Sequence, residues 1–149
     1  MSDALVLKAG EGKRIEARGS EMSFKLTAAL TAGEMSLMER ELPAGAARIS
    51  LPHAHEGREA FYILEGRVDF KLGSETVSCE PGSFVFVPSG VGHTFWNSGD
   101  TPSRLLIIHF PALDPYFEEL QQLWSAAEPP SVDAERALMR KHGMEPAPE

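Results

Sequence analysis

The sequence has one cysteine, no long apolar run and fewer basic than acidic residues. Because Cys79 has no second cysteine to pair with, an internal disulfide is excluded, and we expect this side chain to be a small buried one. No apolar run approaches the roughly 20 residues that span a bilayer. The first residues lack the basic and apolar regions of a secretory signal. We therefore expect a cytoplasmic protein without a membrane partner.

Positive charge is also scarce. The chain has 14 Lys and Arg against 22 Asp and Glu, a formal net charge of −8. A nucleic-acid surface needs clustered Lys and Arg to neutralise phosphates, so we expect no nucleic-acid partner. Phosphate-binding GxGxxG and Walker patterns are missing, and so is a Ser-His-Asp order or an activated cysteine for nucleophilic catalysis. The 149 residues are enough for one domain with its own core.

What the sequence does contain is a series of short apolar segments separated by turns. Val68, Phe70 and Leu72 alternate with polar residues, which is typical of a strand with one buried face. Gly73 and Ser74 then form a two-residue hairpin turn. Many such segments at close spacing predict an all-β sandwich or barrel. The expected strands are residues 13–17, 22–27, 35–42, 48–51, 60–64, 67–72, 75–79, 83–87, 93–97 and 104–110.

The pattern changes to helical periodicity after Pro111. Asp114 is the expected N-cap of a first helix, with Pro115 at its first position. A second helix is expected to begin near Ser131 or Asp133 and to end at Gly143. The tail over residues 145–149 contains two prolines and is expected to be frayed. We therefore expect a barrel over residues 1–112 and two short helices in an extension, residues 113–149, that packs on it.

Three histidines and a glutamate suggest a metal site. Positions i and i+2 of a strand face the same side, so His53 and His55 can point at one atom. Glu59 follows after a turn, and His93 adds a third imidazole. Neutral imidazoles with one carboxylate suit one divalent transition metal, namely Fe, Mn, Ni, Co, Cu or Zn. Four protein ligands leave room at an octahedral metal for a further molecule, as in catalytic sites.

The spacing of these residues resembles the cupin superfamily. Its first motif, G-X5-H-X-H-X3,4-E-X6-G, is matched from His53 through Glu59 to Gly66, with Ala47 in place of the leading glycine. Fifteen residues later comes the second motif, G-X5-P-X-G-X2-H-X3-N, and the core motifs span residues 45–97. The matching residues of the second motif are Gly82, Pro88, Gly90, His93 and Asn97.

The resemblance implies a jelly-roll barrel, also called a double-stranded β-helix, that holds a metal and forms a homodimer. It is similar to small single-domain cupins of the quercetin-dioxygenase type, which implies a dioxygenase-like oxidoreductase acting on a small apolar or aromatic chelating substrate. There Glu59 would be both ligand and base. One alternative is a metal-dependent isomerase, lyase or decarboxylase, with Glu59 or His109 moving a proton. Another is a metal or small-molecule binding or sensing protein without turnover.

Further residues are assigned by strand parity. A mainly apolar substrate pocket is expected to be lined by Phe61, Ile63, Phe70 and Phe95. His109 is either a partner or acid/base group near the metal or, as we favour from sequence, a histidine at the rim or an interface. Arg48 is the nearest basic residue for a phosphate, but its parity places it on the face opposite to His53.

Overall fold

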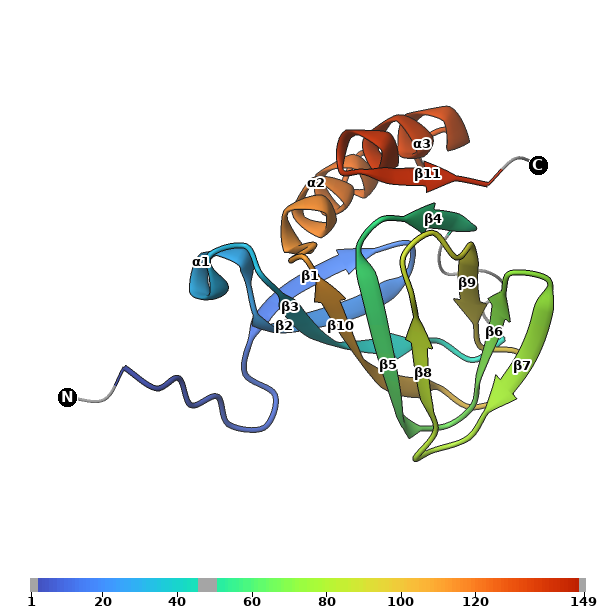
Figure 1. Cartoon of the computed structure of the whole chain (residues 1–149), viewed down its shortest axis with the longest axis horizontal. Coiled ribbons are helices and arrows are strands. Elements are labelled where there is room, and N and C mark those ends of the chain that lie inside the picture. The colour runs from blue at the N-terminus through green and yellow to red at the C-terminus, as the bar shows by residue number, and fades with distance from the viewer. Residues whose placement is uncertain (1–2, 46–50, 148–149) are drawn as a thin grey trace.

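The computed structural model describes residues 3–45 and 51–147, which form two antiparallel sheets and three helices (Figure 1). The first sheet has the order β1 (Lys13–Ala17), β2 (Ser20–Leu26), β3 (Ser36–Leu42), β10 (Ser103–Phe110), β5 (Arg58–Glu65) and β8 (Phe84–Val87). The second has the order β11 (Met144–Pro146), β4 (His53–His55), β9 (His93–Trp96), β6 (Val68–Leu72) and β7 (Glu75–Cys79). This arrangement is the expected all-β barrel.

Most expected strands are present with ends shifted by two residues or fewer. Of the expected strand 48–51, residues 48–50 lie outside the described residues, and Leu51 is not in a strand. Strand β10 illustrates why these segments form strands. Leu105, Ile107 and His109 are buried and alternate with half-buried residues, so one face of the strand is turned to the core.

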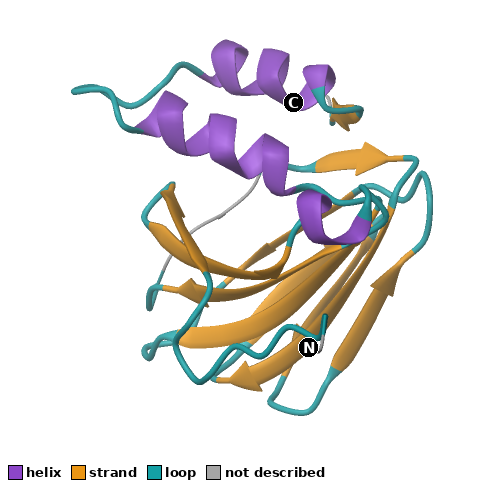
Figure 2. Ribbon diagram, turned by 90° about the vertical axis from the view of Figure 1, so that its left-hand side faces the viewer, coloured by secondary structure: helices purple, strands orange, loops and turns teal. Residues whose placement is uncertain are grey.

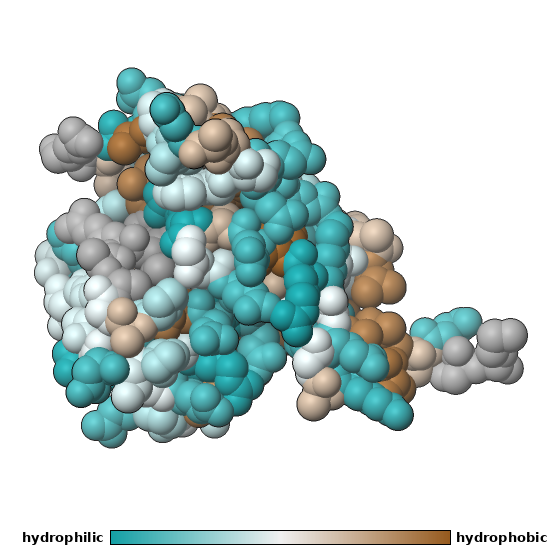
Figure 3. Space-filling view, turned by 180° about the vertical axis from the view of Figure 1, so that it is seen from behind, coloured by the Kyte–Doolittle hydropathy of each residue, from teal (hydrophilic) through white to brown (hydrophobic). Residues whose placement is uncertain are grey.

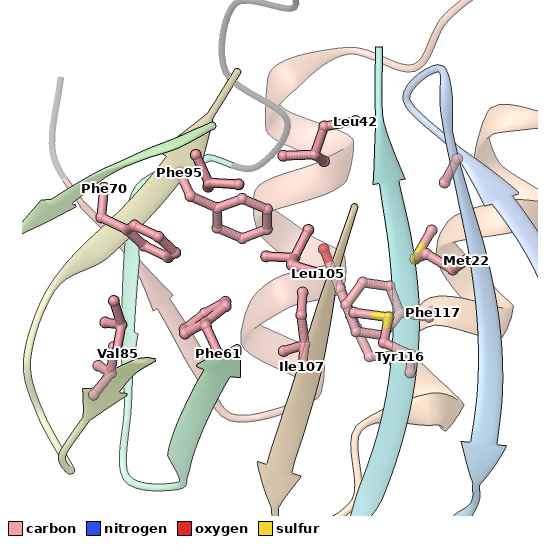
Figure 4. Packing of buried hydrophobic residues seen from close by; sticks show 14 of the residues in the cluster. Met22, Leu42, Phe61, Phe70, Val85, Phe95, Leu105, Ile107, Tyr116 and Phe117 are labelled. Atoms are coloured by element: carbon pink, nitrogen blue, oxygen red, sulfur yellow. The ribbon is translucent and has the colours of Figure 1, made fainter. Parts of the chain in front are cut away.

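The core lies between the two sheets and beneath the helices. Three phenylalanines meet there with their rings at steep angles: the Phe61 ring centroid lies 5.1 Å from that of Phe70 and 5.4 Å from that of Phe95. Figure 4 shows them pointing toward one another, with Leu105 and Ile107 between them and the helical side. Cys79 is buried, as expected.

Helices α2 (Asp114–Trp124) and α3 (Val132–Lys141) lie side by side across one end of the strands (Figure 2). Helix α3 begins as expected, because the Ser131 hydroxyl accepts a hydrogen bond from the Ala134 amide. The N-cap of α2 is Leu113, which corrects the assignment of Asp114. The Asp114 carboxylate instead accepts a hydrogen bond of 2.8 Å from the amide of Ala28, at the start of the short helix α1 (Ala28–Thr31).

The expectation of a frayed tail is wrong for Glu145 and Pro146. Together with Met144 they form β11, an edge strand that pairs with β4, with Met144 opposite His55 and Pro146 opposite His53. Proline is tolerated on an edge strand because no partner needs its missing N–H. The C-terminal segment therefore covers the strand that carries the His-X-His pair. Among the described residues, no helix is long and apolar enough to cross a membrane.

Candidate metal centre

Three neighbouring segments bring the expected ligands together. His53 on β4 and His93 on β9 are directly paired, and their ring centroids lie 4.4 Å apart. His55 follows two residues later on the same face, and a turn at Gly57 leads to Glu59 near the start of β5. One donor atom from each of these four side chains lies within 4.8 Å of the others. The structure thus gathers the whole predicted set around one point.

Each imidazole of this set is oriented by a backbone carbonyl close to it in sequence. The contacts join Nδ1 of His53 to Leu51 O (2.7 Å), Nδ1 of His55 to Gly57 O (2.6 Å) and Nδ1 of His93 to Val91 O (2.9 Å). A carbonyl oxygen only accepts, so Nδ1 must carry a hydrogen, and each ring in its neutral form has its lone pair at Nε2. Burial and the neighbouring His93 lower the pKa of His53 to about 4, which keeps His53 neutral at pH 7.

Glu59 supplies the negative charge of the cluster. Its Oε2 lies 2.7 Å from Nε2 of His93 and 3.4 Å from Nε2 of His55, and the residue is only 5% exposed. Burial raises the pKa of Glu59, but the electrostatic effect of His109 and the contacts with the surrounding imidazoles outweigh it. The pKa of Glu59 is held well below its ordinary value, so the carboxylate is ionised at neutral pH.

This donor set fits a divalent transition metal. Nε2 of His55 is buried and has no hydrogen-bond partner among the described residues, which leaves its lone pair unused. Three imidazole nitrogens and one carboxylate are borderline ligands of the kind that Fe, Mn, Co, Ni, Cu and Zn accept. The backbone contacts of the Nδ1 atoms are the outer support that metal-binding histidines usually have. His53, His55, Glu59 and His93 would hold such an ion.

His109 lies beside this set, and our expectation of a rim or interface position is wrong. It is 2% exposed and is the register partner of Glu59 across β5 and β10, with its Nε2 2.7 Å from Glu59 Oε1. On its other side, Nδ1 lies 3.4 Å from Oγ of Ser36. The Ser36 hydroxyl accepts from the Leu113 amide, so its own hydrogen is free for Nδ1. This favours a hydrogen on Nε2, which lies close to Glu59 but makes no aligned hydrogen bond among the described residues.

Two cavities adjoin the centre. An enclosed cavity of about 30 Å³ borders His53 and Glu59, and a groove of about 810 Å³ borders His55 and His109 from outside. Leu113 and Met144 line both and so separate them.

Of the four expected pocket residues, the structure brings only Phe95 to the enclosed cavity. Phe61, Ile63 and Phe70 are packed deeper in the core and do not border that cavity. Parity identified the correct face of each strand. It carried no information about depth along the barrel.

Sequence reasoning missed two polar residues of the enclosed cavity, Arg40 and Tyr116. Arg40 alternates with the buried Met38 and Leu42 on β3, which is the signal that could have found it. Burial, and then the charge of Arg18, lower the pKa of Arg40 to about 9, so it remains a cation at neutral pH. Burial raises the pKa of Tyr116 to about 12, so its hydroxyl keeps its hydrogen. Arg48, the basic residue considered from sequence, lies outside the described residues.

Two other residues of the second motif, Asn97 and Gly90, make hydrogen bonds that hold the backbone around the site. Asn97 donates from Nδ2 to the Thr101 carbonyl (2.9 Å) and accepts from the Gly99 amide at Oδ1 (2.9 Å), which closes the turn after β9. The amide of Gly90 donates to the carbonyl of His55 (2.8 Å) and so ties the second motif to the first.

Comparison with known proteins agrees with this geometry. The family model described as Cupin domain matches residues 38–109, which include the four ligands. An uncharacterised protein of Streptomyces coelicolor is 31% identical over 101 residues, which cover 68% of this chain and 89% of that protein.

Two solved structures have the same fold. A predicted oxalate decarboxylase from Thermotoga maritima has a TM-score of 0.63 and 26% identity, covering 73% of this chain and 100% of that one. The polyketide cyclase RemF from Streptomyces resistomycificus has a TM-score of 0.62 and 22% identity, covering 72% and 79%. With both motifs in register, the expected barrel and these matches, the chain belongs to the cupin superfamily.

Proposed function

We propose that this cupin is a mononuclear metalloenzyme acting on a small aromatic or otherwise apolar substrate that offers oxygen atoms to the metal. The observation that carries the proposal is the common orientation of the ligands. Backbone carbonyls fix the imidazoles of His53, His55 and His93 with Nε2 directed at one point beside a cavity. A site whose side chains are already held in the binding geometry can take up its ligand without rearranging them.

A bound divalent transition metal would supply Lewis acidity or redox chemistry at this point. The chain's own contribution is proton handling and the exclusion of water. The ionised Glu59 is positioned to accept a proton, and His109, with Nε2 2.7 Å from Oε1 of Glu59, is positioned to stabilise the carboxylate before it does so. Phe95 and Phe117 line the cavity and keep it apolar on one side.

Dioxygenase-like oxidation is the first reaction class that we propose. The test is aerobic and anaerobic incubation of the metal-loaded protein with flavonol, catechol and diketone panels while oxygen uptake is followed. We expect uptake that requires both the substrate and the metal. A heat-treated sample and the metal-free H55A variant serve as controls. Substrate loss without oxygen uptake would reject oxidation and support the second class below.

A non-oxidative lyase, isomerase or decarboxylase is the second class. The contact of His109 with Glu59 favours it, because a paired base and partner suit proton transfer next to a polarised carbonyl. The names of the two structural neighbours, a predicted decarboxylase and a cyclase, point the same way. Tight binding of a panel compound without turnover in air or under nitrogen would instead support the non-catalytic binding or sensing alternative.

Metal content is tested separately from turnover. Elemental analysis of protein purified without a metal-affinity tag should find about one transition metal ion per chain. The H55A variant, purified in parallel, should contain much less. Protein that has no metal and takes up none from solution would overturn the proposal.

We also propose a homodimer formed through the outer face of β5 and β8. Tyr62, Phe84 and Phe86 are 44%, 63% and 51% exposed on that face, and among the described residues β8 pairs only with β5. An unpaired edge beside exposed aromatic residues favours association with a second strand. The N-terminal arm, with exposed Leu5, Val6 and Leu7, projects from the barrel as a second apolar surface (Figure 3). Sedimentation should give a dimer for the wild type and a monomer for F84E/F86E.

A further inference from the structure

Arg40 is a buried cation that has no carboxylate partner among the described residues. It is 3% exposed, and its Nε donates a hydrogen bond of 2.8 Å to Oγ of Ser20. Its guanidinium lies over the rings of Phe95, at 5.4 Å, and Phe117, at 5.9 Å. None of these neighbours is an anion. The terminal nitrogens of Arg40 therefore carry a charge that the described protein groups do not neutralise.

The neighbouring Arg18, unlike Arg40, is neutralised by a carboxylate. Arg18 donates from Nε to Oε1 of Glu135 at 3.0 Å, and its Nη2 contacts the other carboxylate oxygen. Trp124 also donates to that carboxylate. Glu135 is therefore occupied by Arg18. Glu59, the other buried carboxylate close enough to influence Arg40, is surrounded by imidazoles.

Arg40 shares its cavity with the metal centre. Arg40, Tyr116, His53 and Glu59 all line the enclosed cavity of about 30 Å³. We propose that Arg40 is a specificity-determining residue that binds a carboxylate group of the substrate, with the Tyr116 hydroxyl as a neighbouring hydrogen-bond donor. The inference rests on the proposed function, which supplies the apolar part of the substrate. It adds to that substrate class one carboxylate group.

A carboxylate suits this position better than a phosphate. The planar fork of a guanidinium matches the two oxygens of a carboxylate, and one arginine balances its single charge. A phosphate dianion would need a second free cation, but Arg18 is engaged by Glu135. The cavity also has room only for a small group. Leu113 and Met144, which separate this cavity from the outer groove, must move aside to admit the rest of the substrate.

The test compares benzoate with its neutral analogue benzamide by calorimetry. Wild-type protein should bind benzoate roughly 10- to 100-fold more tightly, as expected for a charge-assisted hydrogen bond. The R40M variant should lose this preference. The R14M variant removes the same charge from the exposed Arg14 on β1 and should keep the preference. Inorganic phosphate should bind weakly to all of them, and Arg40-dependent phosphate binding as tight as that of benzoate would overturn the assignment to a carboxylate.

Two further measurements separate this inference from other outcomes. The H55A variant should keep the preference for benzoate without bound metal, so a failure of the metal proposal would leave this result standing. Removing an uncompensated buried charge should leave the melting temperature of ligand-free R40M unchanged or raised. If R40M does not fold, the same binding measurement is made with R40K. This variant keeps the positive charge but lacks the planar guanidinium, and benzoate binding as tight as in the wild type would overturn the proposal.

Discussion

Glu59 and His109 face each other across β5 and β10, with the carboxylate Oε1 2.7 Å from the imidazole Nε2. The other carboxylate oxygen lies 2.7 Å from His93 on the second sheet. Glu59 is therefore held between the two sheets, and both of its oxygens are positioned by imidazoles. Of these two imidazoles, only that of His93 belongs to the candidate metal site, so His109 would act on the site through Glu59.

Replacing His109 should therefore weaken metal binding without removing a ligand. In H109F the Oε1 atom of Glu59 loses its neighbour, and the carboxylate is free to turn. Loss of such a supporting partner typically lowers metal affinity about 10- to 100-fold. Competition with a chelator of known affinity measures this change. H142F, which replaces a histidine that contacts Glu119 on α2, should bind metal as the wild type does. Equal affinity of H109F and H142F would contradict the supporting role of His109.

Replacing His55 should abolish metal binding and spare the fold. Its Nε2 has no hydrogen-bond partner among the described residues, and its side chain borders the outer groove, so H55A breaks no hydrogen bond at Nε2 and leaves space that water can enter. Wild-type protein with metal at 100 times its Kd should gain about 2.7 kcal/mol in the free energy of unfolding. H55A should gain almost none and should keep a β-rich circular dichroism spectrum. An unfolded H55A would mean that the metal is needed for folding.

The sequence predicted the four residues of the candidate metal site because strand periodicity and motif spacing can both be read from the chain. His53 and His55 share a face by strand periodicity alone, and the spacing to Glu59 and His93 is part of two motifs. Arg40 was missed for the opposite reason. In Glu39-Arg40-Glu41 every residue is charged, so the alternation of Arg40 with Met38 and Leu42 is easily overlooked. The packing of Phe95 and Phe117 against Arg40 shows that it points inward.

The two ends of the chain differ from the sequence expectation for physical reasons as well. Strand β11 was missed because it is three residues long and contains Pro146, which lowers strand propensity. What stabilises it is pairing with β4, a contact between residues about 90 positions apart that no local pattern reports. The depth of Phe61 and Phe70 in the barrel likewise depends on strand order, which periodicity does not contain.

Gly66, which ends the first motif, should tolerate no side chain. Its φ is +72°, and an added Cβ would lie 2.6 Å from the carbonyl oxygen of Pro102 and 2.8 Å from Cα of Ser103. Both contacts are with backbone atoms, which move less readily than the end of a flexible side chain. Gly73 also has a positive φ, of +59°, but a Cβ there would meet nothing within 4 Å.

Gly66→Ala and Gly73→Ala therefore form a matched pair. G73A should lose about 1–2 kcal/mol in the free energy of unfolding, from the left-handed backbone alone. G66A should lose a further amount of about 1–3 kcal/mol from the steric overlap. Urea denaturation of both variants measures the difference. Equal losses would show that the backbone at Pro102 and Ser103 moves to accept the methyl group.

Two ion pairs connect the start of the barrel to the helical extension and should differ greatly in strength. Glu135 is buried and Arg18 is largely buried, with side chains 4% and 13% exposed, whereas Lys13 and Glu118 are 52% and 41% exposed. Removing one member of a buried pair costs about 3–5 kcal/mol, because the remaining charge has lost its partner. An exposed pair contributes about 0–1 kcal/mol, because water and salt screen it.

E135Q should therefore destabilise the protein far more than E118Q, although both remove one carboxylate from the extension. Trp96 lies on barrel strand β9, so the comparison is made in a W96F background, where Trp124 is the remaining tryptophan. Its fluorescence during urea denaturation then reports on the extension, because Trp124 donates to Glu135. Circular dichroism of the strands reports on the barrel. If residues 113–149 pack on the barrel as one cooperative unit, both signals should shift together in E135Q. Loss of the fluorescence transition alone would instead mean that the extension unfolds separately from a barrel that remains folded without it.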